Sequence, residues 1–72
     1  MPSSVIRRFH YDEAARRLRI VFVSGDVYDY DGVPPEVEAD FRAAFSKGRF
    51  FAAHIRDRYP FERVEIAVPW EP

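Results

Sequence analysis

The 72-residue sequence contains no cysteine. This absence excludes disulfide bonds and thiolate–metal chemistry, and it is typical of proteins of the reducing cytoplasm. No apolar run approaches the ~20 residues that span a bilayer, and the N-terminus has no signal-peptide core. We therefore expect a cytoplasmic protein that has no membrane partner.

Neither sign of charge is in excess. The 11 lysines and arginines are matched by 12 aspartates and glutamates, and the net charge of −1 argues against a protein that binds polyanions over its whole surface. The charges are nevertheless segregated: residues 1–25 carry five arginines against two carboxylates, and residues 26–40 carry six carboxylates and no basic residue. Residues 41–59 then carry five basic residues against one carboxylate. We expect patches of both signs on a nearly neutral molecule.

The sequence does contain enough apolar surface for one folded domain. Hydrophobic residues make up 47% and aromatic residues 17% of the chain, which is the composition of a folding sequence and not of a disordered one. A chain of this size buries roughly 60% of its unfolded surface. We therefore expect a single domain over residues 1–72.

The first half of the chain predicts β-strands. Leu18, Ile20 and Phe22 alternate with other residues and therefore share one face of a strand. Ile6 and Phe9 are three residues apart, so a β-bulge between them would bring both to the core side. A turn without glycine connects these two strands into a first hairpin.

The second hairpin has two possible registers. A three-residue loop that ends at Gly25 is closed by a positive φ, which glycine adopts at low cost. This loop sets Ile20 opposite Tyr28. It also sets Leu18 opposite Tyr30, so that all four side chains share one face. A two-residue loop would instead turn a carboxylate toward the core, which is costly, and the first register is therefore favoured.

A first helix is predicted to begin at Pro35, because a proline at the first helical position lacks only an N–H that the helix does not use. Its apolar residues have helical spacing and are expected to face the sheet as part of the core. They are Val37, Phe41, Ala44 and Phe45.

A second amphipathic helix is predicted to end at Pro60. Gly48 either ends the first helix or lies in the first turn of the second, with Ser46 as the N-cap. The apolar stripe of the second helix consists of Phe51, Ile55 and Tyr59.

These elements predict an α+β fold, in which a three-stranded antiparallel β-meander is followed by two helices that pack on one face of the sheet. Residues 63–68 alternate weakly between apolar and other residues. We expect them to add a short C-terminal edge strand.

A larger set of residues forms short motifs in a distinctive order. They are Ser4, Ile6, Tyr11, Asp12, Leu18, Ile20, Phe22, Tyr28, Asp29, Tyr30, Val33, Pro34, Pro35, Ser46, Gly48, Phe50, Phe51 and Ile55. In this order and spacing they resemble the KTSC domain family, with the Tyr28-Asp29-Tyr30 motif as the central mark. The family is named for the C-terminus of some lysyl-tRNA synthetases and also occurs as short free-standing bacterial proteins, which this chain resembles.

The resemblance covers about residues 4–61 and leaves residues 62–72 as a C-terminal extension. It implies RNA as a ligand chiefly through the attachment of the family to synthetases. After the two aromatics this chain has Ala52, where relatives often carry asparagine.

The outer face of the second helix is the first candidate site. Arg49, Ala53 and Arg56 fall together on a helical wheel, opposite the apolar stripe, and the small alanine leaves room for a phosphate backbone. Lys47 lies beside them at the helix start, where backbone N–H groups also favour an anion. Phosphate contacts of this kind position a strand without reading its bases. An ordinary solvated helix face explains the same pattern, so both interpretations stay open.

Five arginines of the first hairpin form a second basic group, and their β-branched neighbours suit a protein or an RNA partner equally well. Arg16 is one of them. The four that could extend a phosphate track are Arg7, Arg8, Arg17 and Arg19.

The central tyrosines, Tyr28 and Tyr30, have two interpretations. They could stack on exposed bases, as sheet aromatics do in proteins that bind single-stranded RNA. Alternatively, they fill the interface between sheet and helices, with a hydroxyl at its rim. Since the favoured register places them beside Leu18 and Ile20, the core interpretation is preferred.

Residues that could hold a metal or catalyse a reaction are sparse. The acidic stretch 26–32 with Glu38 is similar to part of a calcium loop, but Val27 stands at the first ligand position. His10 and His54 lack the spacing of a metal pair. We expect no metal, no cofactor and no catalytic residue, and therefore no enzyme.

We therefore predict a small non-catalytic binding module whose first-choice ligand is RNA. A protein–protein interaction module or a homodimerising domain is the alternative, and the sequence leaves the oligomeric state open. The surface geometry separates the two: a continuous basic stripe with an aromatic at its edge favours nucleic acid. Isolated arginines paired with Asp29, Asp31 or Glu38 favour a structural role or a protein partner.

Overall fold

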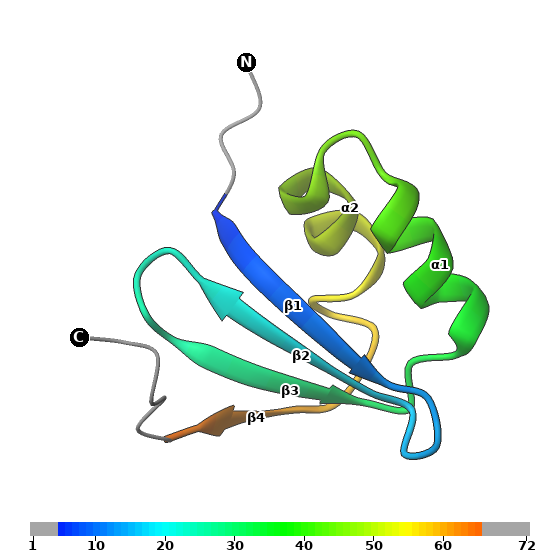
Figure 1. Ribbon diagram of the computed structural model, residues 1–72, viewed down its shortest axis with the longest axis horizontal. Coiled ribbons are helices and arrows are strands. Elements are labelled where there is room, and N and C mark those ends of the chain that lie inside the picture. Colours follow the sequence, from blue (N-terminus) through cyan, green and yellow to red (C-terminus); the bar gives the residue numbers. More distant parts are fainter. Residues whose placement is uncertain (1–4, 66–72) are drawn as a thin grey trace.

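Four antiparallel strands and two helices form the part of the chain that the computed structural model describes, residues 5–65 (Figure 1). The strands lie in chain order across the sheet, β1-β2-β3-β4. This arrangement confirms the predicted α+β fold of a meander, two helices and a short C-terminal strand. The elements are β1 (Ile6–Asp12), β2 (Arg17–Phe22), β3 (Val27–Asp31), α1 (Pro35–Ala43), α2 (Lys47–His54) and β4 (Phe61–Val64).

The last strand, β4, begins two residues earlier than the alternation of residues 63–68 predicted, and residues 66–68 lie outside the described part of the chain. Phe61 pairs with Tyr30 across the sheet. The Pro60 carbonyl accepts a backbone hydrogen bond from the end of β3 at 2.9 Å. Strand pairing therefore starts directly after the proline, at an aromatic residue that a search for alternating aliphatic residues passes over.

The predicted β-bulge is present in β1. Ile6 pairs with Phe22. Two residues later Arg8 pairs with Val21, so β1 contains one extra residue. The shift brings Phe9 to the face of Ile6, where Ile6 is buried and Phe9 packs against the core. This prediction is confirmed.

The β2–β3 hairpin adopts the favoured register. Ile20 pairs with Tyr28. Leu18 pairs with Tyr30. Gly25 has a φ of +98°, and its N–H donates to the last carbonyl of β2 at 2.9 Å, which closes the three-residue loop.

The β1–β2 turn also contains a residue with positive φ, but this residue is not a glycine. Arg16 lies in the left-handed region, with a φ of +53°. The Asp12 carboxylate accepts a hydrogen bond from the Ala15 N–H at 3.3 Å, and the Glu13 carbonyl accepts one from the Arg16 N–H at 3.2 Å. These bonds stabilise a conformation that non-glycine residues rarely adopt.

The first helix, α1, begins at Pro35 as predicted but ends at Ala43. Ala44 leaves the helix with a ψ of 137°, and the Lys47 ammonium donates to the Ala44 carbonyl at 2.7 Å. Beyond this cap the chain turns toward α2, so Phe45 is exposed over 91% of its surface. The prediction that Phe45 belongs to the core is therefore wrong, because its helical spacing continues past the residue where the helix stops.

The second helix, α2, starts with a side-chain cap. The Ser46 hydroxyl accepts a hydrogen bond from the Arg49 N–H at 3.3 Å. Such a bond satisfies one of the backbone donors that a helix start leaves without a partner. Gly48 therefore lies in the first turn of α2, which decides between its two predicted positions.

The same helix ends at His54, six residues before the proline that was predicted to end it. The Arg56 N–H donates to the carbonyl of Phe51, five residues earlier, at 2.9 Å, so the chain leaves the regular helix here. Pro60 also holds Tyr59 away from helical backbone angles. Arg56 and Tyr59 therefore lie in a turn and not on the helical wheel from which they were predicted.

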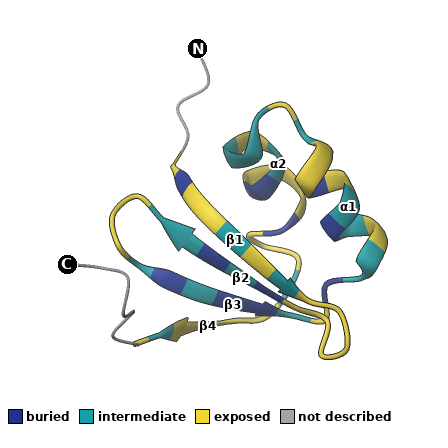
Figure 2. Ribbon diagram, in the orientation of Figure 1, coloured by how far each residue is buried: buried dark blue, intermediate teal, exposed yellow. Residues whose placement is uncertain are grey.

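The helices pack against the apolar face of the sheet and share one core with it, as Figure 2 shows by the buried residues where the layers meet. The Tyr11 hydroxyl donates to the Val33 carbonyl at 2.7 Å, which ties the end of β1 to the loop before α1. The largest fully buried side chains are Phe41, Leu18, Ile20, Ile55 and Val33.

The two helices do not cover the whole apolar face. They lie toward the β1 edge of the sheet, and β4 is the strand farthest from them (Figure 1). Tyr28 of β3 and Phe61 of β4 point to the helix side of the sheet and are therefore only partly covered.

Phe41→Ala should lower the free energy of unfolding by about 3–5 kcal/mol, because it removes a fully buried aromatic side chain. The total stability of such a domain is about 4–10 kcal/mol, so the variant should be largely or nearly unfolded. Phe45→Ala is the matched control and should cost no more than about 0.5 kcal/mol, since Phe45 is exposed. Urea denaturation followed by circular dichroism measures both. Equal stability of the two variants would contradict this core.

Gly25→Val should destabilise the fold by about 1 kcal/mol or more. No atom lies within 4 Å of the position that a Cβ would take, so the cost comes from the positive φ and not from a steric clash with neighbours. Gly25→Asn is the control and should cost less, because asparagine tolerates positive φ better than a β-branched residue. Thermal unfolding of the two variants shows which of them is less stable. A Gly25→Val variant as stable as the wild type would contradict the role of this loop.

Candidate functional site

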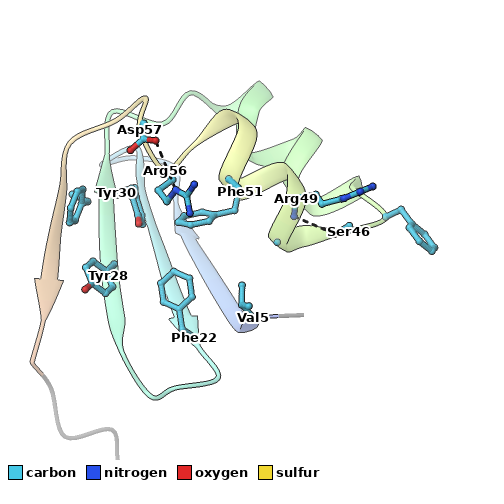
Figure 3. A pocket seen from close by; sticks show the side chains of 13 residues that line it. Val5, Phe22, Tyr28, Tyr30, Ser46, Arg49, Phe51, Arg56 and Asp57 are labelled. Carbon is cyan, nitrogen blue, oxygen red and sulfur yellow. Dashed lines mark hydrogen bonds and ion pairs between the residues drawn. The ribbon is translucent and has the colours of Figure 1, made fainter. Parts of the chain in front are cut away.

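A groove of about 970 Å³ opens between α2 and the part of the sheet that the helices leave uncovered (Figure 3). Its size falls within the range of small-molecule and cofactor sites. Six of its 13 lining residues are aromatic, and those of the sheet and α2 are Phe22, Tyr28, Tyr30, Phe51 and Phe61.

These aromatic rings contact one another and form the floor of the groove. The ring centres of Tyr28 and Phe61 lie 5.5 Å apart, and those of Tyr30 and Phe61 lie 5.6 Å apart. Phe22 meets Phe51 edge to face at 5.5 Å. Tyr30 is 3% exposed, which confirms its predicted place in the core, whereas Phe61 is 56% exposed and Tyr28 is half-buried. The floor therefore combines a packed base with ring surface that a ligand can reach.

Exposed apolar side chains gather around the same groove. Within residues 5–65, four large hydrophobic residues are exposed, and three of them line the groove: Val5, Phe45 and Phe61. Only Val23 lies elsewhere. Exposed apolar surface that converges on one concavity is typical of a binding site.

Two arginines lie on the α2 side of the groove. Arg49 comes from the first turn of α2, and Arg56 comes from the turn that follows the helix. In the view of Figure 3 the Phe51 side chain lies between them. Arg49 has no ion pair within the described residues, and Arg56 has only a long contact of 4.0 Å from its Nε to an Asp57 carboxylate oxygen. The structure thus brings together two predicted site residues, although Ala53 of the predicted wheel does not line the groove.

Lys47 is separated from these two arginines by its own hydrogen bond. Its ammonium caps the last carbonyl of the α1 turn, that of Ala44, and Lys47 does not line the groove. Its predicted role beside Arg49 and Arg56 is therefore not supported by the position of its side chain.

The arginines of the first hairpin do not line the groove either. Arg17 forms an ion pair with Asp31 at 2.9 Å. Arg19 donates two hydrogen bonds to the Asp29 carboxylate, at 2.7 and 3.0 Å. Both pairs join β2 to β3 on the sheet face opposite the groove. The remaining predicted arginines are Arg7 and Arg8 on edge strand β1 and Arg16 in the adjacent turn, and all three are exposed.

The acidic residues of the predicted calcium-like stretch are also engaged with arginine. Asp26 pairs with Arg63 at 3.0 Å, and Glu38 pairs with Arg42 of the same helix at 3.3 Å. No group of three or more histidine, cysteine, aspartate or glutamate side chains in the described part of the chain could hold a metal ion.

The histidines do not form a catalytic arrangement within residues 5–65. His54 is exposed and packs on Phe50 with ring centres 4.6 Å apart. His10 is exposed on β1, opposite Arg19. The Ser46 hydroxyl is occupied as the helix cap of α2.

Burial and charge act on several ionisable groups of the fold. Burial raises the pKa of Tyr30 to about 12 from an ordinary value of 10.0, and the charges of Arg56 and Asp57 act on this pKa in opposite directions. Burial likewise raises the pKa of Tyr11. The hydrogen bond to Asp29 raises the pKa of Arg19, so this guanidinium stays charged within its ion pair.

The family comparison matches residues 2–59, close to the span over which the motifs resemble the KTSC domain. The chain belongs to the KTSC domain family. The matched span ends before β4, although β4 pairs with β3 within the same sheet.

Relatives place KTSC sequences in two contexts. The chain is 43% identical over 61 residues to a lysine–tRNA ligase of Nostoc punctiforme; this match covers 85% of the chain but spans only 11% of the ligase. It is also 42% identical over 57 residues to a protein of Tsukamurella paurometabola, covering 79% of this chain and 85% of that one. The chain is therefore similar both to a small part of a ligase and to nearly the whole of a short protein.

A solved structure has the same fold. The crystal structure of a KTSC domain protein from Yersinia pestis superposes with a TM-score of 0.82 at 34% sequence identity. The match covers 90% of this chain and 94% of that one. No helix within residues 5–65 is long and apolar enough to cross a membrane.

Four groove residues were missed in the sequence. Phe45 was placed in the core, and Val5, Phe61 and Asp57 were given no role. Phe61 follows Pro60 directly, and an aromatic at the start of an edge strand was the only signal for it. No local pattern marks Asp57, because its place at the groove depends on where α2 ends.

Ionisation of Tyr30 should make the protein less stable at high pH. Tyrosine in the unfolded chain ionises near pH 10, whereas folded Tyr30 keeps its proton to about pH 12. Its contribution is therefore fully present below about pH 10 and is lost as pH rises to about 12, by up to about 2–3 kcal/mol. Tyr30→Phe should flatten this loss, with a smaller fall left from Tyr11. Urea denaturation between pH 8 and 11.5, at roughly half-unit steps, tests this, and an unchanged slope would contradict it.

Proposed function

We propose that this KTSC domain is a non-catalytic module that binds single-stranded RNA in the groove between α2 and β2–β4. The observation that carries this proposal is that two arginines, Arg49 and Arg56, line the same groove as an aromatic floor that remains partly open. Neither arginine has a close ion pair within the described residues. A cytoplasmic location belongs to the same proposal and rests on the absence of cysteine.

The open rings supply the first half of the interaction. Phe61 and Tyr28 present aromatic surface at the side of the groove away from the helices. Stacking of a base on such a ring contributes about 1–3 kcal/mol and tolerates any sequence. Tyr30 supports these rings from below and is too buried to stack on a base itself.

The two arginines supply the second half. A guanidinium can donate two parallel hydrogen bonds to a phosphate. Arg49 and Arg56 both line the groove on its α2 side. Arg56 lies beside Tyr30, whereas Arg49 extends toward the Ser46 end of the groove (Figure 3). Since the Lys47 ammonium donates to the Ala44 carbonyl, we expect about two phosphate contacts, and not one from each of the three basic residues predicted on that helix face.

The relatives support the same ligand class. One of them is a lysine–tRNA ligase, whose name includes an RNA substrate, and the chain matches 11% of its length. We infer that the module contributes RNA contacts in that setting and that the free-standing form retains them.

A protein partner is the second candidate, either a different protein or a second copy of this chain. It is favoured by the ion pairs of Arg17 and Arg19 with aspartates, which neutralise the arginines that a longer phosphate track would need. Exposed Phe45 and Phe61 would also suit a protein surface. This candidate predicts no RNA binding even at about 50 mM salt, where electrostatic complexes are strongest.

Replacing Arg49 and Arg56 by glutamine should weaken RNA binding by about tenfold or more, because it removes both phosphate contacts. For the wild type, log affinity should fall with log salt at a slope of about −1 to −1.5, and the double variant should bring this slope close to zero. Fluorescence anisotropy with labelled oligouridine at several salt concentrations measures both quantities.

The matched control is Arg16→Gln combined with Arg58→Gln, which makes the same change in charge at exposed arginines that do not line the groove. This variant should bind nearly as the wild type does. Absence of binding at low salt would reject RNA as the ligand, and equal losses in the two double variants would reject the groove as the site.

A further inference from the structure

We propose that the groove prefers guanine among the RNA bases, and that Arg56 and Asp57 form the pair that recognises its edge. This inference rests on the proposed RNA binding and adds a base preference to it. Phosphate contacts alone would bind any sequence. The groove contains one feature that phosphate binding does not explain, which is a carboxylate.

Asp57 is the only acidic side chain that lines the groove within the described residues. It would repel a phosphate backbone, so its presence is unfavourable unless it accepts hydrogen bonds from the ligand. Its side chain is 87% exposed, and within residues 5–65 it has no hydrogen bond that would occupy the carboxylate. Both of its oxygens can therefore accept hydrogen bonds from a ligand.

Arg56 precedes Asp57 directly, and the two side chains lie side by side. The Arg56 Nε is 4.0 Å from an Asp57 carboxylate oxygen, which is close enough for attraction but too long for a hydrogen bond. Figure 3 shows both side chains at the Tyr30 end of the groove. Their opposite effects on the pKa of Tyr30 agree with this position. The chain thus presents an acceptor group and a donor group next to each other beside the aromatic floor.

The Watson–Crick edge of guanine is complementary to this pair. It presents two adjacent N–H donors, N1 and the N2 amino group, followed by the O6 acceptor. The two oxygens of the Asp57 carboxylate can accept hydrogen bonds from both donors. One of the five N–H groups of the Arg56 guanidinium can donate to O6, while the others remain available to a phosphate. A base stacked on Phe61 or Tyr28 lies at the same end of the groove, because both rings contact Tyr30.

The other bases fit this pair less well. Adenine and cytosine each place a ring-nitrogen acceptor beside their amino group, and uracil has one N–H between two carbonyl oxygens. Each of them would direct a lone pair at one oxygen of the Asp57 carboxylate. A polar group that is left facing the wrong partner opposes binding, so the carboxylate selects against these bases as well as for guanine.

The test uses five-nucleotide RNAs of sequence UUXUU, in which X is guanine, adenine, cytosine, uracil or hypoxanthine. Binding is measured by competition fluorescence anisotropy at about 50 mM salt. The guanine RNA should bind about tenfold more tightly than the adenine RNA, as expected for one bidentate pair. Hypoxanthine lacks the N2 amino group, and its RNA should lose part of this advantage.

Asp57→Asn is the decisive variant, because it removes the charge and one acceptor from an exposed side chain. It should abolish the preference for guanine and should strengthen binding of all-uridine RNA, since the repulsion of phosphate is removed. Glu62→Gln is the matched control: it makes the same charge change at an exposed residue of β4 that does not line the groove, and it should keep the preference.

The outcomes separate this inference from the proposed function. Failure of every RNA to bind would overturn both. Equal binding of all five RNAs, tightest binding of another base, or a guanine preference that survives Asp57→Asn would overturn the guanine pair alone and leave RNA binding in place. Circular dichroism of each variant confirms that its fold is retained.

Discussion

The pairing of β2 with β3 is the constraint on which the rest of this structure depends. Because side chains alternate across a strand, a slip of one residue would turn Tyr28 and Tyr30 to the opposite face and bring Asp29 into the core. Gly25 prevents this slip by closing a three-residue loop with a positive φ. The same register sets Asp29 opposite Arg19, so one turn fixes both the aromatic face and the ion pairs behind it.

The groove follows from a mismatch between the sheet and the helices. Four strands make a face wider than two helices of nine and eight residues can cover, so the core fills one side of that face and the groove occupies the other. Tyr30 belongs to both: it packs in the core cluster and supports the more open ring of Phe61. A ligand on these rings would therefore rest on side chains that are already held in place, which reduces the entropy lost on binding.

Local rules predicted the parts of this fold that local interactions determine. The β-bulge before Phe9 and the loop at Gly25 follow from alternation and turn chemistry, which act over a few residues. The ends of the helices were not predictable in the same way, because α2 stops where the chain must turn back toward β4. For that reason Arg49 and Arg56 were predicted together from a helical wheel that the structure does not contain, and Phe45 was assigned to the core when it lies at the groove rim.

The net charge of −1 gives little information about whether this protein binds an anion. Arg17 and Arg19 of β2 are distant in sequence from Asp31 and Asp29 of β3, but antiparallel pairing brings them together as two ion pairs. Because the charges within each pair cancel, these arginines contribute little to the electrostatic potential at the surface. Arg49 and Arg56 have no such partner strand, so their charge stays concentrated at the groove. Local potential in a concave site depends on the charges that folding leaves unpaired, and not on the sum over the chain. A nearly neutral domain can therefore still place arginines without a close ion pair beside an aromatic floor.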